Sequence, residues 1–229
     1  QKYIAIAFHE KDQPLVDQLQ TTLGGTIRVK TKEHALVLTI RKKQAIQNFL
    51  EIVYGKLRTP KQHDLQKFSD IGNRDITPLL SNAWLAGFLD GDSGFKIRYT
   101  FEKRDPETNK IKTKHRIAVS FVIEQRKTHK LTGESFEPIM QKIADCFEVP
   151  LADRRHNGQS YYCVEISSFF KLKKLIDYLE VFQLLSLKAL DFNDWKQAWE
   201  MIGKKEHLTL EGKAKILALK NGMNHKRIM

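Results

Sequence analysis

Cysteine and long apolar stretches are both scarce in this sequence. Its 229 residues include two cysteines, Cys146 and Cys163, which have neither a CxxC spacing nor a histidine partner. This excludes a disulfide-stapled secreted domain and a zinc finger, and it predicts two reduced core residues in an intracellular compartment. No stretch approaches the roughly 18 consecutive apolar residues of a membrane-spanning helix, and no signal peptide is recognisable. The sequence therefore predicts a globular protein without a membrane partner.

Acidic residues are outnumbered by basic ones. The chain has 27 Asp and Glu against 39 Lys and Arg, a formal net charge of +12. Such an excess predicts an anionic partner. Because no basic amphipathic helix stands out, nucleic acid is favoured over a membrane surface. A generally basic protein without such a partner is the alternative on charge alone.

The same order of elements occurs twice along the chain. Residues 2–10 alternate like a strand, residues 14–24 and 42–55 have helical periodicity, and residues 25–32 and 34–40 form a strand pair between the two helices. The second copy comprises residues 116–125, 135–149, 151–157, 159–167 and 169–182. Matched positions lie 115 residues apart at Glu10 and Gln125, and 127 apart at Lys61 and Lys188. We therefore expect an internal duplication.

The duplication sets the expected domain limits. Residues 1–70 form the first repeat, residues 71–81 a linker, and residues 82–229 the second repeat. Residues 82–115, a helix followed by a long strand, have no counterpart in the first repeat. Since the chain starts at Gln1 directly in strand-like sequence, we expect a segment of about this length to be missing before it.

The segment LAGFLDGD, residues 85–92, predicts a helix that ends in a carboxylate. Ala83, Gly87 and Gly91 recur every four residues and share one face without side-chain bulk. Glycine costs about 0.8–1 kcal/mol relative to alanine inside a helix, so this face predicts the close approach of a second helix. Asp92 lies where the helix dipole disfavours negative charge, a penalty that a bound divalent cation would reverse. The alternative is a solvated aspartate in a helix-ending turn.

The overlapping tetrapeptide GDSG, residues 91–94, also surrounds the nucleophile of chymotrypsin-like proteases. That chemistry needs His and Asp partners placed by a double β-barrel. Here Ser93 follows an expected α-helix, and no matching His and Asp context is present. The sequence therefore strongly disfavours a serine protease.

These segments resemble a known family. LAGFLDGD resembles the signature motif of the LAGLIDADG homing endonucleases, and SNAWLAGFLDGDSGF, residues 81–95, resembles the second motif of their two-repeat, organelle-intron-encoded members. The likeness extends to GKLRTPK, residues 55–61, and to DWKQAWEMIGKKEHLTLEGKAKI, residues 194–216. It implies an α+β fold, a pseudo-twofold pair of αββαββα half-domains whose antiparallel sheets lie over DNA. The first half is expected to lack its N-terminal motif helix and first strand.

The resemblance implies roles for the residues at the end of the motif. Asp92 corresponds to the metal-binding acid of the second motif, and Gly91 to the residue whose carbonyl helps to bind the metal, Mg²⁺ or another divalent cation. Asp90 matches an earlier acid of the motif that is usually structural. Ala83, Gly87 and Gly91 correspond to the helix interface.

The resemblance also implies the remaining catalytic residues. Lys61 and Lys188 correspond to basic residues near the scissile phosphates, and Glu10 and Gln125 fall where polar groups position metal-bound water. The implied activity is a staggered, metal-dependent double-strand cut at a specific DNA site. The implied location is organellar, most often mitochondrial.

A long basic hairpin, residues 95–125, supports nucleic-acid binding from its pattern alone. Alternate residues of a strand lie on opposite faces, and here one face is cationic while the other carries residues such as Ile117 and Phe121. A ribbon of this kind suits a core on one side and a DNA major groove on the other. An ordinary solvated sheet face is the alternative, and the basic tail 225–227 is a weaker candidate. The candidate DNA-binding residues are Lys96, Arg98, Thr100, Arg104, Lys110, Lys112, Lys114, Arg116, Arg28, Lys30, Lys32, Arg126, Arg154 and Arg155.

Two other functions fit the same basic surface. Members of this family also act as RNA-binding maturases that assist group I intron splicing, and a chain that has lost cleavage would keep only nucleic-acid binding. The chain departs from the family in having no first motif. The first motif helix is therefore expected from a separate polypeptide or from a lost N-terminal piece.

Overall fold

The computed structural model describes residues 2–224, and its first half is built on a three-stranded antiparallel sheet of order β1-β3-β2. The strands are β1 (Ile4–His9), β2 (Thr26–Lys30) and β3 (Ala35–Ile40). The short 3-10 turns η1 (Glu10–Asp12) and η2 (Thr31–Glu33) follow β1 and β2. Helix α1 (Gln13–Leu23) covers one face, where its Val16 shares a buried cluster with Leu36 and Leu38 of β3. Helix α2 (Lys43–Val53), the 3-10 turn η3 (Pro60–Gln62) and α3 (His63–Gln66) complete this half.

The second half has a four-stranded antiparallel sheet of order β4-β7-β9-β8. Helix α4 (Trp84–Asp92) leads directly into β4 (Ser93–Thr100), and β7 (Arg116–Arg126) returns beside it after a small hairpin of β5 (Lys103–Arg104) and β6 (Ile111–Thr113). Helix α5 (Glu137–Cys146), β8 (Leu151–His156), β9 (Gln159–Ile166) and α6 (Phe169–Val181) follow. Helices α7 (Lys188–Gly203) and α8 (Leu210–Gly222), with the 3-10 turn η4 (Glu206–Leu208) between them, end the described chain. The basic tail 225–227 lies outside the described residues.

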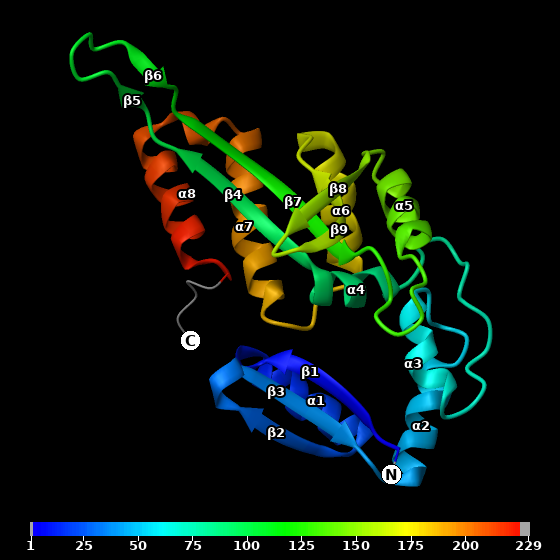
Figure 1. Ribbon diagram of the computed structural model, residues 1–229. Helices are drawn as coiled ribbons and strands as arrows, with labels where there is room; N and C mark the ends of the chain where they lie inside the picture. Colours follow the sequence, from blue (N-terminus) through cyan, green and yellow to red (C-terminus); the bar gives the residue numbers. More distant parts are fainter. Residues whose placement is uncertain (1, 225–229) are drawn as a thin grey trace.

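The two sheets share one topology. The order β7-β9-β8 in the second half repeats the order β1-β3-β2 in the first, with a helix after the first strand and another after the third in each case. The α+β class with paired antiparallel sheets is therefore confirmed. Within residues 2–81 no helix or strand corresponds to α4 or β4. In Figure 1 the first sheet lies below the second, and α2, α3 and the linker join them along one side.

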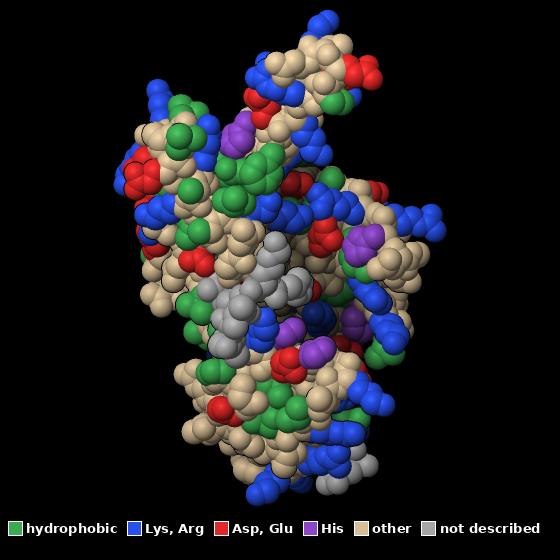
Figure 2. All heavy atoms as spheres, turned by 90° about the vertical axis from the view of Figure 1, so that its left-hand side faces the viewer, with side chains coloured by type: hydrophobic (Ala, Val, Ile, Leu, Met, Phe, Trp, Pro, Cys, Tyr) green, Lys and Arg blue, Asp and Glu red, His purple; other side chains and the backbone are tan. Residues whose placement is uncertain are grey.

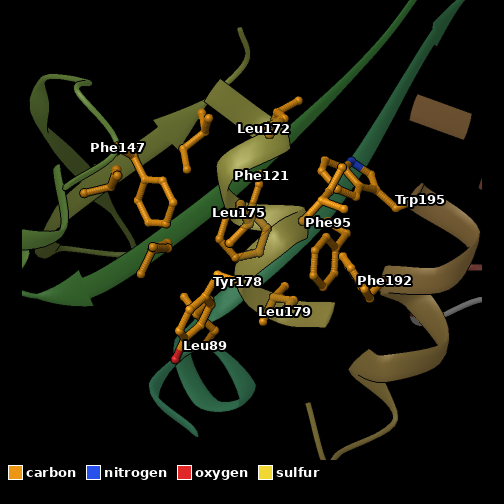
Figure 3. Close-up of a cluster of buried hydrophobic side chains, with 14 of the residues drawn as sticks. Leu89, Phe95, Phe121, Phe147, Leu172, Leu175, Tyr178, Leu179, Phe192 and Trp195 are labelled. Atoms are coloured by element: carbon orange, nitrogen blue, oxygen red, sulfur yellow. The ribbon is translucent and has the colours of Figure 1, made fainter. Parts of the chain in front are cut away.

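The larger core lies between the second sheet and its helices (Figure 3). Phe95 of β4 and Phe121 of β7 project from the same face of the sheet and pack together, with ring centroids 4.9 Å apart. Trp195 of α7 is fully buried against Phe95 and donates its indole N–H to the carbonyl of Ser120 at 3.1 Å. Both cysteines are unpaired, as expected. Within residues 2–224 no helix is long and apolar enough to cross a membrane.

An ion cluster of five side chains connects the two halves away from α4; we call it the interface ion cluster. It consists of His63 and Asp64 of α3, Arg74 of the linker, and His129 and Glu134 after β7. The Glu134 carboxylate bonds His63 Nε2 and Arg74 Nη1, each at 2.5 Å, and His129 Nε2 lies 3.4 Å from Asp64 Oδ1. Arg74 and then His63 lower the pKa of Glu134 to about 2, and hydrogen bonds to Glu134 and Gln66 raise the pKa of His63.

These shifts predict a pH window for the stability that the cluster contributes. Ionised Glu134 stabilises the fold above its ordinary pKa of 4.5, and this contribution is lost as the pH falls from 4.5 toward about 2. Protonated His63 stabilises it below its ordinary pKa of 6.5, and this contribution is lost as the pH rises through the raised folded value. In denaturant titrations, Glu134→Gln should therefore weaken both the acid and the alkaline decline in the free energy of unfolding. His63→Gln should remove only the alkaline decline, because Arg74 still binds Glu134; an unchanged alkaline limb would contradict the assignment.

Candidate active site and nucleic-acid interface

The carboxylate of Asp92 lies at the C-terminal end of α4, as the sequence predicted. Asp92 is the last residue of the helix, and its side chain is 33% exposed. Partial burial raises the pKa of this carboxyl, against the opposing effects of Lys61 and Lys188. An ionised carboxylate in this position is therefore unfavourable for folding. Carboxylates with perturbed pKa values are typical of functional sites, although structural ion pairs also produce them.

Lys188 reaches the same helix end from α7. It is the first residue of α7, and its Nζ lies 3.2 Å from the carbonyl oxygen of Leu89 and 3.3 Å from that of Gly91. An ammonium group there complements the negative end of the α4 dipole. Burial lowers the pKa of Lys188, while nearby carboxylates, Asp90 and Asp92 first, raise it. The structure therefore brings Lys188 to the helix end that carries Asp92.

Lys61 approaches from the first half. It lies in η3, where the Thr59 hydroxyl accepts a hydrogen bond from the Lys61 amide at 3.3 Å. Its Nζ is 3.9 Å from Asp92 Oδ2, and its side chain is 59% exposed. An ion pair this exposed adds little to stability, so Lys61 is available to an anionic ligand. Asp92, Lys61 and Lys188 thus converge from three separate elements.

The neighbouring carboxylate, Asp90, is engaged in the fold. Its Oδ2 accepts from the Leu185 amide at 2.8 Å, and its Oδ1 accepts from the Ser186 amide at 3.2 Å and the Ser186 hydroxyl at 2.5 Å. These bonds fasten the chain that precedes α7 onto α4. The contacts agree with the structural role that the resemblance implies for Asp90.

Among residues 2–224, no hydrogen bond or ion pair joins Glu10 or Gln125 to Asp92, Lys61 or Lys188. The Glu10 carboxylate bonds His34 Nδ1 at 2.7 Å and has no other side-chain hydrogen bond within the described chain. Gln125 has the same strand parity as Phe121 and Ile123, so it lies on the helix-covered face of the sheet. It is 7% exposed, and among residues 2–224 its Oε1 has no hydrogen-bond partner. Their roles in positioning water stay predictions.

Oxygen donors for a divalent cation gather at the end of α4 without completing a coordination shell. Asp92 offers carboxylate oxygens and Gly91 a carbonyl oxygen, the hard ligands that Mg²⁺ prefers. In the described part of the chain, no three or more His, Cys, Asp or Glu side chains form a group that could hold a metal ion. The donor chemistry fits Mg²⁺, which retains several water ligands in most protein sites.

The small face of α4 is open. Gly87, Gly91 and the preceding Ala83 are all exposed, and a Cβ added at either glycine would meet no atom within 4 Å. The opposite side of the helix is buried through Leu85 and Leu89, which are fully inaccessible. The close helix approach that the sequence predicts is therefore not made by any segment of residues 2–224.

The outer face of the second sheet carries several of the predicted DNA-binding residues. Lys96 and Arg98 are exposed and alternate with the buried Phe95 and Ile97 of β4. The antiparallel register places Thr100 opposite Arg116 on this outer face, and Arg126 has the same strand parity at the far end of β7. The predicted alternation is therefore confirmed for β4 and β7, where these residues lie on one face of the sheet.

The outer face of the first sheet is only weakly basic. Arg28 and Lys30 lie on it opposite Val37 and Ala35, and Lys30 is paired with Glu33 at 3.0 Å. Lys32 was predicted to continue this row, which is wrong: it falls in η2, after β2 has ended. The break occurs because the chain turns at Thr31–Glu33 to enter β3.

The prediction of one continuous basic ribbon over residues 95–125 is also wrong. The ladder stops at Thr100 and Arg116, and β5 and β6 form a separate two-stranded tip whose register shifts at Arg104. Arg104 therefore pairs with Ile111 instead of sharing the face of Lys110 and Lys112, while Lys114 lies between strands. Figure 2 shows that the protruding tip is nevertheless rich in Lys and Arg side chains.

Tyr99 marks the interruption of the ribbon. Its ring packs against those of Phe101 and His115, with centroids 4.9 Å and 5.1 Å away. This aromatic group occupies the base of the hairpin, where a regular ladder would continue. The packed rings lie at the point where the ladder of β4 and β7 ends.

Arg154 and Arg155 lie on opposite faces of β8. Arg154 pairs with Tyr161 and faces outward, whereas Arg155 pairs with Ser160 and has the opposite parity. Both were candidate DNA-binding residues, and only Arg154 lies on the outer face; DNA contact by either residue stays a prediction. Sequence reasoning also missed the two carboxylates that hold Arg154: Glu124 at 2.5 Å and Glu165 at 2.6 Å. Only the strand register, which the sequence does not show, brings them together.

Comparison with known proteins gives a consistent picture. A family model described as LAGLIDADG endonuclease matches residues 1–71 and 85–199. "Probable intron-encoded DNA endonuclease aI1" of Mycosarcoma maydis is 44% identical over 99 residues, which cover 43% of this chain and 82% of that protein. The "Uncharacterized cox1 intron-2 37.2 kDa protein" of Schizosaccharomyces pombe is 25% identical over 227 residues, covering 93% of this chain and 64% of that protein. "Intron-encoded DNA endonuclease aI3" of Saccharomyces cerevisiae is 26% identical, with coverage of 85% and 55%. The chain thus spans less than two thirds of the last two relatives.

Solved structures show the same fold. The LAGLIDADG meganuclease I-AabMI, bound to uncleaved DNA, superposes with a TM-score of 0.73 at 19% identity, over 97% of this chain and 89% of that chain. The meganuclease I-SmaMI, bound to uncleaveable DNA, gives a TM-score of 0.68 at 18% identity, over 98% and 88%. The family model matches most of the chain and the paired αβ halves match these structures, so this chain belongs to the LAGLIDADG endonuclease family.

Proposed function

We propose that this protein is a site-specific DNA endonuclease that makes a double-strand cut with the help of a divalent metal ion. The observation that carries the proposal is the convergence of Asp92, Lys61 and Lys188 at one helix end. Two lysines beside one half-buried carboxylate suit an anionic substrate that is bound together with a cation. The two antiparallel sheets, one in each half, would provide the surfaces that grip the duplex.

The residues at the end of α4 have separate tasks in this proposal. Asp92 and the Gly91 carbonyl would hold Mg²⁺, which when bound activates water and neutralises charge at a phosphodiester. Lys61 and Lys188 bring positive charge to the same place and would stabilise the negative charge that develops on the phosphate oxygens. Lys188 donates to the Leu89 and Gly91 carbonyls; once the Gly91 carbonyl binds the metal, the Leu89 carbonyl would still orient the ammonium.

Sequence selectivity would come from the outer faces of the sheets. Lys96, Arg98 and Arg116 present exposed cationic groups that a strand pair can carry into a major groove. Arg154 is held between two carboxylates, an arrangement that orients its guanidinium for a base edge better than for a phosphate. The solved relatives I-AabMI and I-SmaMI are described as bound to DNA, which supports the same substrate class for this chain.

The open face of α4 supports a further part of the proposal. A second helix of the same type would pack on Ala83, Gly87 and Gly91 and place its own carboxylate beside Asp92, so that the metal site is shared. That helix could be supplied by the same polypeptide or by a separate one. The proposed origin is an organellar, mitochondrial intron, since the similar protein of Schizosaccharomyces pombe carries "cox1 intron-2" in its name.

Cleavage of a selected duplex tests the function. A target would be selected from a randomised DNA library by binding, and the duplex would then be incubated with the protein in the presence of Mg²⁺ or of a chelator. Both strands should be cut only with Mg²⁺, while binding persists in the chelator because the sheet contacts need no metal. Tight sequence-specific binding without any cut in Mg²⁺ would show a binding protein instead of a nuclease.

A further inference from the structure

Asp12 of the first half reaches across to the helix that carries Lys188. Its Oδ1 accepts a hydrogen bond from the Leu187 amide at 2.9 Å, and Leu187 immediately precedes the first residue of α7. Asp12 and Lys188 also line the same cavity of about 370 Å³ between the halves. We propose that Asp12 is a positioning residue that sets the place of Lys188, an inference that rests on the proposed nuclease function.

The carboxylate of Asp12 does not cap its own helix, α1. Asp12 occupies the N-cap position of α1, with a proline in the first turn, yet its side chain makes no capping bond to that helix. Aspartate at an N-cap ordinarily accepts from the amides of its own helix. Here the acceptor serves α7 instead, where an anion also complements the positive end of the helix dipole. The side chain therefore acts between the halves.

Backbone amides at the start of α7 donate to acceptors from both the first and the second half of the chain. The Leu185 and Ser186 amides donate to Asp90 of α4, and the Lys188 amide donates to the Ser186 hydroxyl at 3.2 Å. Only the Leu187 amide, among these four consecutive amides, donates to the first half. Asp12 is thus the link through which the first half fixes the residue directly before Lys188.

In the part of the chain that the structure describes, the second half does not support the amides of η3 in the same way, although Glu134 of the interface ion cluster bonds His63 next to η3. By the repeat spacing of 115 residues, the counterpart of Asp12 in the second half is Lys127, which pairs with Asp153 at 2.6 Å and lies over the Tyr162 ring. The turn that carries Lys61 is capped within its own segment, by Thr59. Within residues 2–224, no carboxylate of the second half takes the equivalent place at η3. Because Lys61 and Lys188 reach the same helix end through separate supports, loss of Asp12 should displace Lys188 and leave Lys61 in place.

Cleavage of supercoiled plasmid carrying the selected target tests this inference. Asp12→Ala in the full polypeptide should slow cleavage by about 10- to 100-fold, the cost of a misplaced catalytic group. The affinity for DNA should stay unchanged. Asp12→Asn retains an acceptor oxygen and should restore most of the linear product. Asp17→Ala, an exposed aspartate of α1 in the same half, is the matched control and should behave like the natural protein.

Hydrogen exchange of the Leu187 amide tests the hydrogen bond to Asp12 directly, without a cleavage assay. Exchange should accelerate in Asp12→Ala and stay slow in Asp12→Asn and Asp17→Ala. If the natural protein binds DNA but does not cut it, the nuclease proposal fails. The exchange rate of the Leu187 amide still tests whether Asp12 caps α7. Unchanged exchange in Asp12→Ala, or a cleavage rate in that variant equal to that of the natural protein, overturns the positioning role.

Discussion

Asp92→Asn is expected to reduce DNA cleavage by roughly a thousandfold or more, the scale on which a catalytic metal lowers a barrier. The substitution removes the charge of the carboxylate at the end of α4 and keeps its shape. Without that charge, the carbonyl of Gly91 alone would not hold a divalent cation. The measurement is single-turnover cleavage of the selected duplex in saturating Mg²⁺.

The same variant should bind DNA at least as tightly as the natural protein and should be no less stable. Asp92 repels a phosphate, so its neutralisation weakens no contact with the duplex. Burial raises the pKa of Asp92, which means that the ionised form opposes folding at neutral pH. Thermal unfolding without metal should therefore show an unchanged or higher midpoint, an example of a site that favours activity over stability.

The control for Asp92→Asn is Asp177→Asn. Asp177 is exposed on α6, where it pairs with Lys173, and its neutralisation changes the net charge by the same amount. It should leave cleavage and binding unchanged. Full cleavage by Asp92→Asn, or equal losses in the two variants, would overturn the assignment of Asp92 as the metal-binding carboxylate.

Gly87→Leu should abolish cleavage without destabilising residues 2–224. A Cβ at Gly87 meets nothing within 4 Å, and leucine has a better helix propensity than glycine. If a second helix packs on this face in the active nuclease, a leucine side chain would keep it from the close approach that glycine permits. Overpacking of this kind costs about 1–3 kcal/mol and would displace the second carboxylate from Asp92.

Gly87→Ala is the matched variant. It should raise the free energy of unfolding by about 0.8–1 kcal/mol, the propensity difference at an exposed helix position. Its cleavage should fall between those of the natural protein and Gly87→Leu, because a methyl group intrudes less than an isobutyl group. Natural cleavage rates in Gly87→Leu would show that no helix covers this face during the reaction.

The duplicated fold was predictable because it depends on local patterns. Strand alternation in residues 116–125 predicted the apolar face of β7, and the structure places Val119 and Phe121 in the core. The helix that ends at Asp92 was predictable for the same reason, since glycine spacing and the change to strand alternation at Phe95 are visible in one short segment. The roles of Lys61 and Lys188 came from the resemblance, and the structure then brought both to α4.

Predictions failed where pairing between distant segments decides the geometry. Strict alternation assigned Arg104 and Lys112 to one face, but the register shift in the tip separates them. Arg154 and Arg155 were named together as DNA-binding candidates, and the structure places them on opposite faces of β8, as adjacent strand residues must lie. Lys32 was assigned to a strand that had already ended at Lys30.

The sequence by itself determined the basic charge, the two repeats, the α+β class and the carboxylate-ended helix with its small face. These properties depend on composition and on contacts within a few residues. Only the tertiary structure decided that Asp92, Lys61 and Lys188 meet, that Asp90 is engaged in the fold, and that Asp12 caps α7 instead of its own helix. Those outcomes depend on how the two halves are placed against each other, and the free energy of that packing is spread over many distant side chains.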